Sequence, residues 1–454
     1  MNIKYNSKEI QKGDTFIALK TNNDGHKYIN DAIKNGATKI VAEYGSYPVE
    51  TLLVDNTKEY LVKYLYENYY QEIKDLKLIG ITGTNGKTTT CMLLHNMLNM
   101  LGRKTAYIGT NGFYINKFIK ELPNTTPEII DIYELLLEAK EEACEFVCIE
   151  ASSHGLDQKR LAGLKFNYAI FTNLTHEHLG YHKTMEKYAL AKQNLFKMLR
   201  NNKYAIINND DKYKEYFLLK ENNNITYSFT KGDYYIKDYQ ITSSHSTFKV
   251  INKNKEYTFT TKLLGKHNIY NSLASIIVLN KIGYSFEEIN NVLTIVSGPK
   301  GRMENISYNN NNIIIDYAHT PDGIANVLKT AKELKPNQII TIMGCGGGTG
   351  SDREKRSTMG KLVLELSNKT IFTNDNPRDE EPNQIINDLL KEKTNNNYII
   401  ELDRKKAIEQ GIKMLTNNDI LLILGKGHEN YQTIGNKKTH FSDKETVEEI
   451  IKEN

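Results

Sequence analysis

The chain has 454 residues, about three times the length of a typical domain, and 39% of them are hydrophobic, which is enough for several separate cores. Its 59 basic and 55 acidic residues nearly balance, and no basic block with interleaved aromatic residues occurs, so a nucleic-acid partner is not expected. The N-terminal residues lack the apolar core of a signal peptide, and no apolar run approaches the roughly 20 residues that span a bilayer. We therefore expect a cytoplasmic enzyme of several domains without a transmembrane segment.

The pattern of apolar runs divides the chain into three modules. Residues 1–75 form a small α/β unit with no obvious catalytic residues. In residues 76–298, strand-like runs alternate with helix-compatible stretches, which predicts a largely parallel sheet. The expected strands are Leu78–Thr82, Phe146–Glu150, Ala169–Asn173 and Ala205–Asn208. Short alternating runs between Tyr213 and Phe259 predict an antiparallel accessory region.

The third module, residues 299–454, repeats an apolar strand followed by a polar or glycine-rich loop four times. These strands are Ile313–Ile315, Ile339–Met343, Lys369–Thr373 and Ile420–Leu424. Open α/β sheets bind ligands at the carboxyl ends of their strands, so we expect the four loops to meet on one rim and to form a second substrate-binding surface.

A phosphate-binding turn is predicted where an apolar strand leads into Gly83-Thr84-Asn85-Gly86-Lys87-Thr88-Thr89, followed by a helix-like stretch, Cys91–Met100. Backbone N–H groups of such a turn face phosphates, Lys87 would neutralise their oxygens, and Thr88 would offer its hydroxyl to Mg²⁺. The strict pattern G-x-x-x-x-G-K-[ST] is not met, because its first position falls on Ile81. A plain glycine turn is the alternative, but the order of strand, glycines, lysine and threonine favours a modified P-loop.

Two further segments of the second module carry candidate metal ligands. Glu150 ends a predicted strand and could hold Mg²⁺ beside the phosphates, the alternative being a surface acid at a strand exit. The segment His176-Glu177-His178-Leu179-Gly180 does not match the zinc signature H-E-x-x-H, and the four cysteines form no metal framework. One histidine helping a magnesium ion fits this module better than a structural zinc site.

Lys192 lies on the apolar face of a helix-like stretch, Thr184–Leu199. Spacing alone favours a snorkelling side chain with a solvated ammonium group. The alternative is a buried lysine with a depressed pKa that takes part in chemistry or accepts a modification.

Together these motifs resemble the Mur ligase family, ATP-dependent enzymes that form amide bonds in peptidoglycan synthesis. The resemblance covers nearly the whole chain in order. Besides the P-loop, it rests on Asn124–Pro127, Glu150–His154 with Gln158 and Arg160, Thr172–Lys192, Leu264–Asn271, Gly301–Glu304, Asp316–Asp322, Asp375–Arg378 and Gly425–Glu429. It implies an α/β protein of three domains: an N-terminal domain for the UDP-sugar, a central P-loop ATPase domain with a parallel sheet, and a C-terminal Rossmann-like domain for the amino acid.

The family's reaction, carried over, converts a carboxylate of a nucleotide-sugar dipeptide to an acyl phosphate with ATP, and an incoming amine then forms the amide. Positioning and charge neutralisation would supply much of the catalysis. By resemblance, Glu150 binds one Mg²⁺, His178 binds a second, and Lys192 is carbamylated, so that it offers a carboxylate to the metal. Asn268, Arg302 and Asp316 match positions that contact ATP, and domain closure would assemble the site.

Substrate contacts are also implied by the resemblance. Ser7 matches a uridine-side contact, although Asn6-Ser7-Lys8 replaces the family's Asp-Ser-Arg. The muramoyl-peptide contacts match Thr125, Thr126, Ser152, Gln158 and Arg160. All partners would be small molecules, and we expect a monomer.

The segment Asp375-Asn376-Pro377-Arg378 resembles the signature of enzymes that add meso-diaminopimelate. An arginine there can pair with the distal carboxylate, which lysine lacks, while Gly425 and Glu429 would hold the distal amine. The altered loop from Gly346 to Arg356 leaves open whether Arg353 or Arg356 binds the α-carboxylate, and we choose Arg353.

Other readings remain. The same ligase could use L-lysine or another diamino acid, such as lanthionine. A sister ligase that adds a dipeptide, D-glutamate or folate glutamates is disfavoured by the complete Asp375–Arg378 and Gly425–Glu429 segments. A non-catalytic nucleotide-binding homologue is an alternative of a different class, which would show no ATP turnover with a matched substrate set and is disfavoured by the intact Lys87, Glu150, His178 and Lys192. A mechanical P-loop ATPase is a third class, which would hydrolyse ATP without an acceptor amine.

Overall fold

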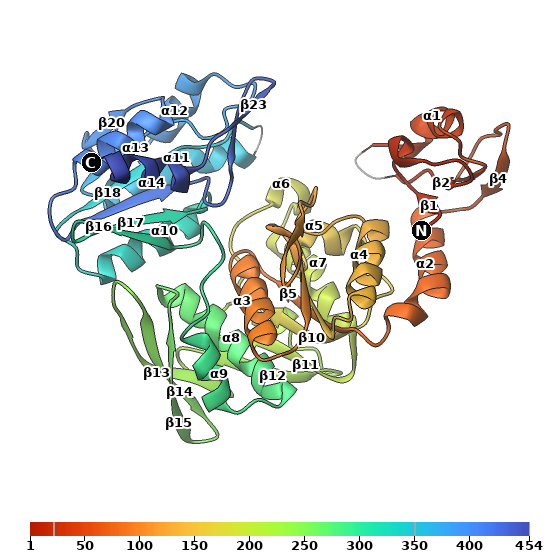
Figure 1. Cartoon of the computed structure of the whole chain (residues 1–454), viewed down its shortest axis with the longest axis horizontal. Coiled ribbons are helices and arrows are strands. Elements are labelled where there is room, and N and C mark those ends of the chain that lie inside the picture. Colours follow the sequence, from red (N-terminus) through yellow and green to blue (C-terminus); the bar gives the residue numbers. More distant parts are fainter. Residues whose placement is uncertain (21–22, 349–350, 454) are drawn as a thin grey trace.

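The computed structural model describes residues 1–20, 23–348 and 351–453, and three main β-sheets follow one another along this chain. Figure 1 shows a small N-terminal unit set apart at one side, a large central unit and a C-terminal unit beside it. Helix α2 (Thr57–Ile73) joins the first unit to the second. Among the described residues, no helix combines the length and the apolar character needed to span a bilayer.

The N-terminal sheet has the order β1-β2-β3-β4 with parallel pairing throughout. Its elements are β1 (Ile3–Lys4), β2 (Thr15–Ile17), α1 (Ile29–Lys34), β3 (Lys39–Ala42) and β4 (Glu50–Leu53). Phe16, Ile29 and Ile40 are fully buried in its core. The prediction of a small α/β unit is confirmed.

The central sheet has eleven strands in the order β15-β14-β13-β12-β11-β10-β5-β9-β6-β7-β8. Its strands are β5 (Lys77–Thr82), β6 (Thr105–Gly109), β7 (Gly112–Ile115), β8 (Lys117–Lys120), β9 (Phe146–Glu150), β10 (Phe166–Phe171), β11 (Leu199–Asn208), β12 (Asn223–Ser228), β13 (Tyr234–Ile241), β14 (Ser246–Asn252) and β15 (Lys255–Thr261). The middle strands pair in parallel, while β13–β15 and β6–β8 are antiparallel at the two edges. The predicted parallel sheet and antiparallel accessory region are therefore both confirmed.

Helices cover both faces of this sheet, which explains why its central strands are continuous apolar runs. They are α3 (Lys87–Met100), α4 (Ile129–Glu141), α5 (Ser153–Asp157), α6 (Leu179–His182), α7 (Met185–Lys197), α8 (Lys266–Ile282) and α9 (Phe286–Leu293). Along β5, Leu78 packs into one core with residues of α4 and α7, while Ile79 and Ile81 pack into another with α3 and α8. The sheet therefore lies between two helical layers and holds the P-loop at the carboxyl end of β5.

The C-terminal sheet has the order β16-β17-β21-β18-β19-β20, parallel except for β16. Its strands are β16 (Glu304–Tyr308), β17 (Asn311–Asp316), β18 (Ile339–Met343), β19 (Lys369–Phe372), β20 (Tyr398–Ile400) and β21 (Ile420–Leu424). Its helices are α10 (Pro321–Glu333), α11 (Ser351–Leu366), α12 (Pro382–Leu390), α13 (Arg404–Lys413) and α14 (Asp443–Glu453), and a hairpin of β22 (Tyr431–Ile434) and β23 (Lys437–His440) follows β21. The four strands predicted from the sequence are neighbours, so their following loops share one edge.

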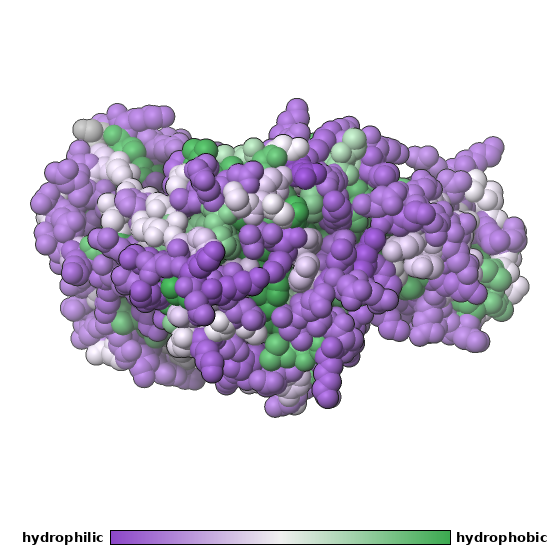
Figure 2. All heavy atoms as spheres, turned by 90° about the horizontal axis from the view of Figure 1, so that it is seen from below, coloured by the Kyte–Doolittle hydropathy of each residue, from purple (hydrophilic) through white to green (hydrophobic). Residues whose placement is uncertain are grey.

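The proposed domain boundaries fall between these sheets. Residue 75 lies between α2 and β5, and residue 298 lies between α9 and β16. Figure 2 shows one face of the molecule, on which hydrophilic residues predominate and apolar residues appear in small groups.

Candidate active site

The P-loop turn lies between β5 and α3, and its glycines are required by the backbone. Gly83 has a φ of 150°, and a Cβ there would lie 1.9 Å from Oγ1 of Thr172 and 3.0 Å from the carbonyl oxygen of Asn173. Gly86, with a φ of 87°, is the N-cap of α3. The helix therefore begins at Lys87, earlier than the predicted Cys91, and its N-terminus faces the cavity described below.

Lys87 folds back over the turn. Its ammonium donates to the carbonyl oxygens of Gly83 at 2.9 Å and Thr84 at 2.8 Å. Burial lowers its pKa, and the carboxylates of Glu150 and Glu177 oppose that shift. Its direct partners are uncharged carbonyls, so a bound phosphate would favour the charged form of this lysine.

Glu150 ends β9 and is fully buried, so it is not a surface acid. Its Oε2 accepts from the hydroxyl of Thr88 at 2.9 Å, and its Oε1 accepts from Tyr107 at 2.5 Å. Thr110 also donates to Oε1 through its backbone N–H, at 3.1 Å. The carboxylate and the Thr88 hydroxyl are thus held together beside the P-loop.

Lys192 is 1% exposed, so the snorkelling expected from spacing is wrong. Its ammonium donates to the carbonyl of Gly83 at 2.8 Å and lies 4.6 Å from the ring centroid of Tyr188. Burial lowers its pKa well below the usual value, and the nearby Lys87 ammonium lowers it further. The Lys192 side chain is therefore buried and hydrogen-bonded to the P-loop.

His178 caps α6 with a φ of 56°, a backbone conformation uncommon for residues other than glycine. Its Nε2 lies 3.7 Å from the carboxylate of Glu177, and its ring meets those of His154 and Tyr188 at centroid distances of 4.9 Å and 6.0 Å. Since Lys192 lies against Tyr188, the structure brings His178 and Lys192 to the same corner of the site.

A cavity of about 500 Å³ lies between the central unit and the C-terminal unit, and residues of both line it. Both units contribute predicted ATP contacts to its lining. They are Thr84, Asn85, Gly86, Lys87, Thr88, Thr89 and Asn268 from the central unit, and Arg302 and Asp316 from the chain that follows. Thr125, Glu150 and His178 line it as well.

The wall of this cavity formed by the C-terminal unit carries polar side chains held by contacts with nearby residues. Asp316 accepts from the backbone N–H groups of Met303 and Ala318, each at 2.7 Å, and its burial raises its pKa. The Arg302 guanidinium lies 4.7 Å from the ring centroid of Tyr317, and its Nε is buried without a hydrogen-bond partner among the described residues. An acceptor on a bound molecule would satisfy that donor.

A direct hydrogen bond crosses between the two units. The side-chain amide of Asn85 in the P-loop donates to Oδ2 of Asp322 in α10 at 2.7 Å. The relative position of the two walls is therefore held at the phosphate-binding turn itself.

The predicted muramoyl-peptide residues form one cluster. Thr126 donates to the backbone carbonyl of Glu150 at 2.7 Å and bonds Ser152 at 2.9 Å. Arg160 donates to the carbonyl of Thr126 and to the side chain of Gln158, each at 2.7 Å. Thr125 completes the cluster at the cavity edge, whereas Ser7 lies in the N-terminal unit, outside this cavity.

The predicted amino-acid contacts meet on the rim of the C-terminal sheet, also outside the cavity lining. Asn376 donates to Glu429 at 2.8 Å, and a Cβ on Gly425 would lie 2.5 Å from Oδ2 of Asp375. Pro377 follows Asn376, and Arg378, with a φ of 54°, donates to the carbonyl of Gly347 at 3.2 Å. Convergence of the strand-end loops is therefore confirmed.

The two candidate arginines of α11 differ in their surroundings. Arg356 is fully buried and forms ion pairs with Glu380 and Asp388, both at 2.8 Å. Arg353 is 48% exposed and bonds Glu380 through its Nε at 2.8 Å. Residues 349 and 350 of this altered loop lie outside the described residues.

Sequence reasoning missed several residues. Lys426 is fully buried, and its ammonium bonds Glu429 at 3.2 Å and lies 4.0 Å from Asp375. His319 and Glu177 line the nucleotide cavity. His319 lies in the Asp316–Asp322 motif and Lys426 lies in the Gly425–Glu429 motif. Their position within these motifs is the sequence feature that could have identified them.

The described residues contain no group of three or more His, Cys, Asp or Glu side chains arranged to hold a metal ion. Magnesium commonly uses one or two protein oxygens and completes its shell with water and phosphate. The adjoining oxygens of Thr88 and Glu150 fit that requirement.

Family models match two long segments of the chain: the Mur ligase middle domain over residues 81–279, and the Mur ligase, glutamate ligase domain over residues 301–427. The chain belongs to the Mur ligase family. Membership confirms the α/β fold expected from the resemblance, with its central P-loop unit and its C-terminal sheet.

Two full-length relatives carry the name UDP-N-acetylmuramoyl-L-alanyl-D-glutamate--2,6-diaminopimelate ligase. The protein of Aquifex aeolicus (strain VF5) is 42% identical over 455 residues, covering 99% of this Mur ligase and 93% of the relative. The protein of Clostridium botulinum (strain ATCC 19397 / Type A) is 38% identical over 463 residues, covering 99% and 95%. A solved structure with the same name has 31% identity and a TM-score of 0.72, covering 99% of this chain and 94% of that one.

Proposed function

We propose that this Mur ligase joins meso-2,6-diaminopimelate to the D-glutamate of UDP-N-acetylmuramoyl-L-alanyl-D-glutamate, at the expense of ATP. The observation that carries the proposal is full-length similarity to relatives named for that reaction. A cavity shared by the P-loop and the C-terminal unit supports it. The enzyme would act as a cytoplasmic monomer on peptidoglycan precursors.

The reaction has two steps. A carboxylate oxygen of the D-glutamate attacks the γ-phosphorus of ATP, and ADP leaves with the electrons of the broken P–O bond. The amine of the amino acid then attacks the acyl carbon, phosphate leaves, and the amine gives up a proton. The protein's main task is to align these groups and to offset the phosphate charge.

The P-loop supplies the phosphate site. Lys87 can exchange its bonds to the carbonyls of Gly83 and Thr84 for phosphate oxygens, because both partners are uncharged. Thr88 and Glu150 would hold one Mg²⁺, which neutralises phosphate charge when bound. The unpartnered Nε of Arg302 and the fixed carboxylate of Asp316 would contact the nucleotide from the facing wall, opposite Asn268.

Lys192 would carry a carbamate. A carbamate forms when a neutral amine attacks CO₂ and loses a proton, and a low pKa supplies the neutral amine. The new carboxylate would lie near His178 and would hold a second Mg²⁺ with it.

The amino acid would bind at the C-terminal rim. Arg378 would pair with the distal carboxylate, while Glu429 and the Gly425 carbonyl would hold the distal amine, with Asp375, Asn376 and Pro377 shaping the loop. Arg353 suits the α-carboxylate better than Arg356, since Arg353 is half-exposed with one carboxylate partner, whereas Arg356 is fully buried between two. Thr125, Thr126, Ser152, Gln158 and Arg160 would contact the muramoyl peptide, and Ser7 the uridine.

The test is phosphate release by the full chain with ATP, Mg²⁺ and UDP-N-acetylmuramoyl-L-alanyl-D-glutamate, across meso-diaminopimelate, lanthionine, L-lysine and L-ornithine. Release that depends on diaminopimelate supports the whole proposal. Dependence on lysine would keep the ligase and contradict the role of Arg378. Release without any amine would contradict the ligase assignment.

A further inference from the structure

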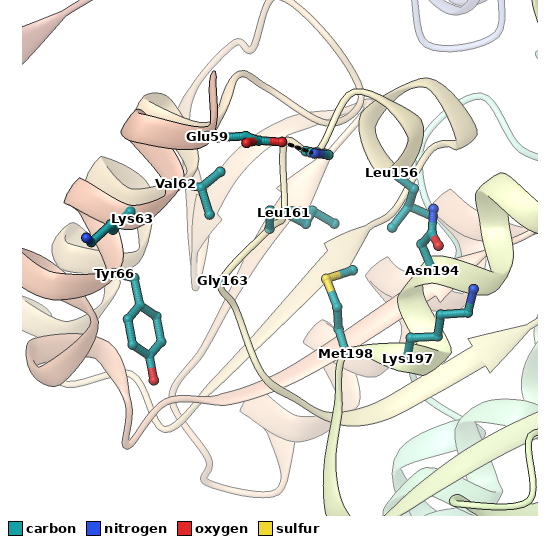
Figure 3. Close-up of a pocket in the computed structure, with 12 residues that line it drawn as sticks. Glu59, Val62, Lys63, Tyr66, Leu156, Leu161, Gly163, Asn194, Lys197 and Met198 are labelled. Atoms are coloured by element: carbon teal, nitrogen blue, oxygen red, sulfur yellow. Dashed lines mark hydrogen bonds and ion pairs between the residues drawn. The ribbon is translucent and has the colours of Figure 1, made fainter. Parts of the chain in front are cut away.

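A second cavity, of about 590 Å³, lies away from the nucleotide site, between helix α2 and the central unit. Figure 3 shows Val62 and Tyr66 of α2 on one side and Leu156, Asn194 and Met198 on the other. These segments are far apart in sequence and close the cavity only in the folded chain. Nothing in the proposed reaction uses it.

The walls of this cavity are apolar and its edge is basic. Val62, Leu161 and Met198 supply aliphatic surface and sulfur, and Tyr66, 43% exposed, supplies an aromatic ring. Three lysines line the edge, against one carboxylate. The charged lining residues are Lys63, Lys159, Lys197 and Glu59.

The three lysines of the lining differ in their ion-pair partners. Lys159 forms an ion pair with Glu59 at 3.3 Å, and Lys63 lies 3.8 Å from Glu67 one turn along α2. Lys197 is exposed at the end of α7, and among the described residues it has no ion-pair partner within 4.0 Å. The cavity therefore has a net excess of positive charge beside an apolar interior, which is complementary to an amphipathic anion.

We propose that this cavity binds a small amphipathic anion, with an aromatic or aliphatic body between α2 and Met198 and its carboxylate, sulfonate or phosphate at Lys197. Burying the apolar body is favourable because it leaves water. The anion stays at the exposed edge, where it remains solvated and the desolvation cost is low.

The cavity also adjoins the turn that carries the proposed muramoyl-peptide contacts. Lys159, with a φ of 58°, lies between Gln158 and Arg160 and is held by Glu59 of α2. Glu59 and Lys159 both line the cavity, so an occupant whose anion lies at Lys197 also contacts this ion pair with its body and loosens it. Binding in the cavity then weakens binding of the nucleotide-sugar dipeptide, a second step that rests on the proposed function.

The first test is a fluorescence titration of the full chain with 1-anilinonaphthalene-8-sulfonate. Val62→Phe fills the cavity and should weaken binding at least about tenfold, which corresponds to about 1.4 kcal/mol. Ile295→Phe, a matched substitution at an exposed residue outside the cavity, should leave the affinity unchanged. Equal affinity of the two variants would overturn the assignment of the site.

The charge is tested separately, so that a folding defect in Val62→Phe does not decide the outcome. Lys197→Gln should weaken binding about two- to fivefold, as expected for an exposed ion pair, whereas Lys187→Gln on the same helix should not. N-phenyl-1-naphthylamine, which lacks the sulfonate, should not distinguish Lys197→Gln from the wild type. Equal sulfonate affinity for both lysine variants would overturn the anion's placement.

The coupling is measured by calorimetry without catalysis. Saturating 1-anilinonaphthalene-8-sulfonate should weaken UDP-N-acetylmuramoyl-L-alanyl-D-glutamate binding at least about twofold, and the linkage must be reciprocal. If saturating 1-anilinonaphthalene-8-sulfonate leaves the affinity for the nucleotide-sugar dipeptide unchanged, the coupling is wrong, while the binding site in the cavity is unaffected by that result. No dipeptide binding at all would instead count against the proposed function.

Discussion

The two halves of the proposed active site hold their cations in different ways. In the central unit, Lys87 and Lys192 donate to backbone carbonyls. On the C-terminal rim, Lys426 bonds Glu429 and Arg353 bonds Glu380, whereas the Arg378 guanidinium donates to a carbonyl, that of Gly347. A carbonyl leaves the charge of its partner in place, whereas a carboxylate cancels it. The nucleotide half is therefore ready for an anion, while in the amino-acid half Arg353 and Lys426 must exchange existing ion pairs and Arg378 need not.

The largest effect is expected for Lys87→Met. The Lys87 ammonium donates to uncharged carbonyls, so its positive charge is available to stabilise phosphate oxygens. Removing it should lower kcat for phosphate release at least about 10²-fold. Lys183→Met is the matched control, because Lys183 also donates to a carbonyl, that of Gly180 at 2.6 Å, but does not line the cavity. Similar kcat values for the two variants would remove the distinction between the halves.

Lys192→Ala should also abolish synthesis, with a loss of at least about 10²-fold in kcat, because the group proposed to hold the second metal ion disappears. If the lysine acts as a carbamate, a short-chain carboxylic acid should partly restore activity by occupying the space left. Lys192→Met, which keeps the volume, should not be rescued. Wild-type activity in Lys192→Ala would refute the role.

Arg378→Ala should raise KM for diaminopimelate about 10- to 100-fold, since a hydrogen bond to a charged group is worth about 1.5–3 kcal/mol. KM for ATP should change less than about twofold, because Arg378 is outside the nucleotide cavity. Arg103→Ala, which alters an ion pair with Glu145 elsewhere, serves as the control. Parallel increases in both KM values would argue against the distal-carboxylate assignment.

The smallest effect is expected where the halves meet. Asp322→Ala removes the acceptor for Asn85, a loss of about 1 kcal/mol, so kcat/KM should fall about fivefold. Asp322→Asn retains an oxygen acceptor and should fall less. If both variants match the wild type in steady-state kinetics, the Asn85–Asp322 bond does not help to position the two walls.

The parts of the fold set by short-range pattern could be predicted from sequence. The apolar run before Gly83 and the glycine-lysine-threonine order gave the strand, turn and helix. The repeated order of apolar strand and polar loop predicted that the loops of the C-terminal unit meet on one rim. In each case the decisive residues are neighbours in the chain.

The parts that depend on distant residues could not be predicted from pattern alone. Lys192 has the spacing of a snorkelling lysine, yet it is buried and donates to the carbonyl of Gly83, 109 residues away. Arg353 and Arg356 lie on one helix, but Asp388 and Glu380 hold Arg356 in the interior. The lysine-edged cavity needs α2, the turn after α5 and the end of α7 together.

The carbonyl of Gly83 accepts from both Lys87, at 2.9 Å, and Lys192, at 2.8 Å. Two full positive charges at a single oxygen repel each other, and the deeper amine is the one whose pKa falls well below its usual value. If that amine carries a carbamate, dissolved CO₂ becomes a component of the working enzyme. Preparations stripped of gas would then lose activity during storage and regain it on exposure to bicarbonate, with no change in the polypeptide.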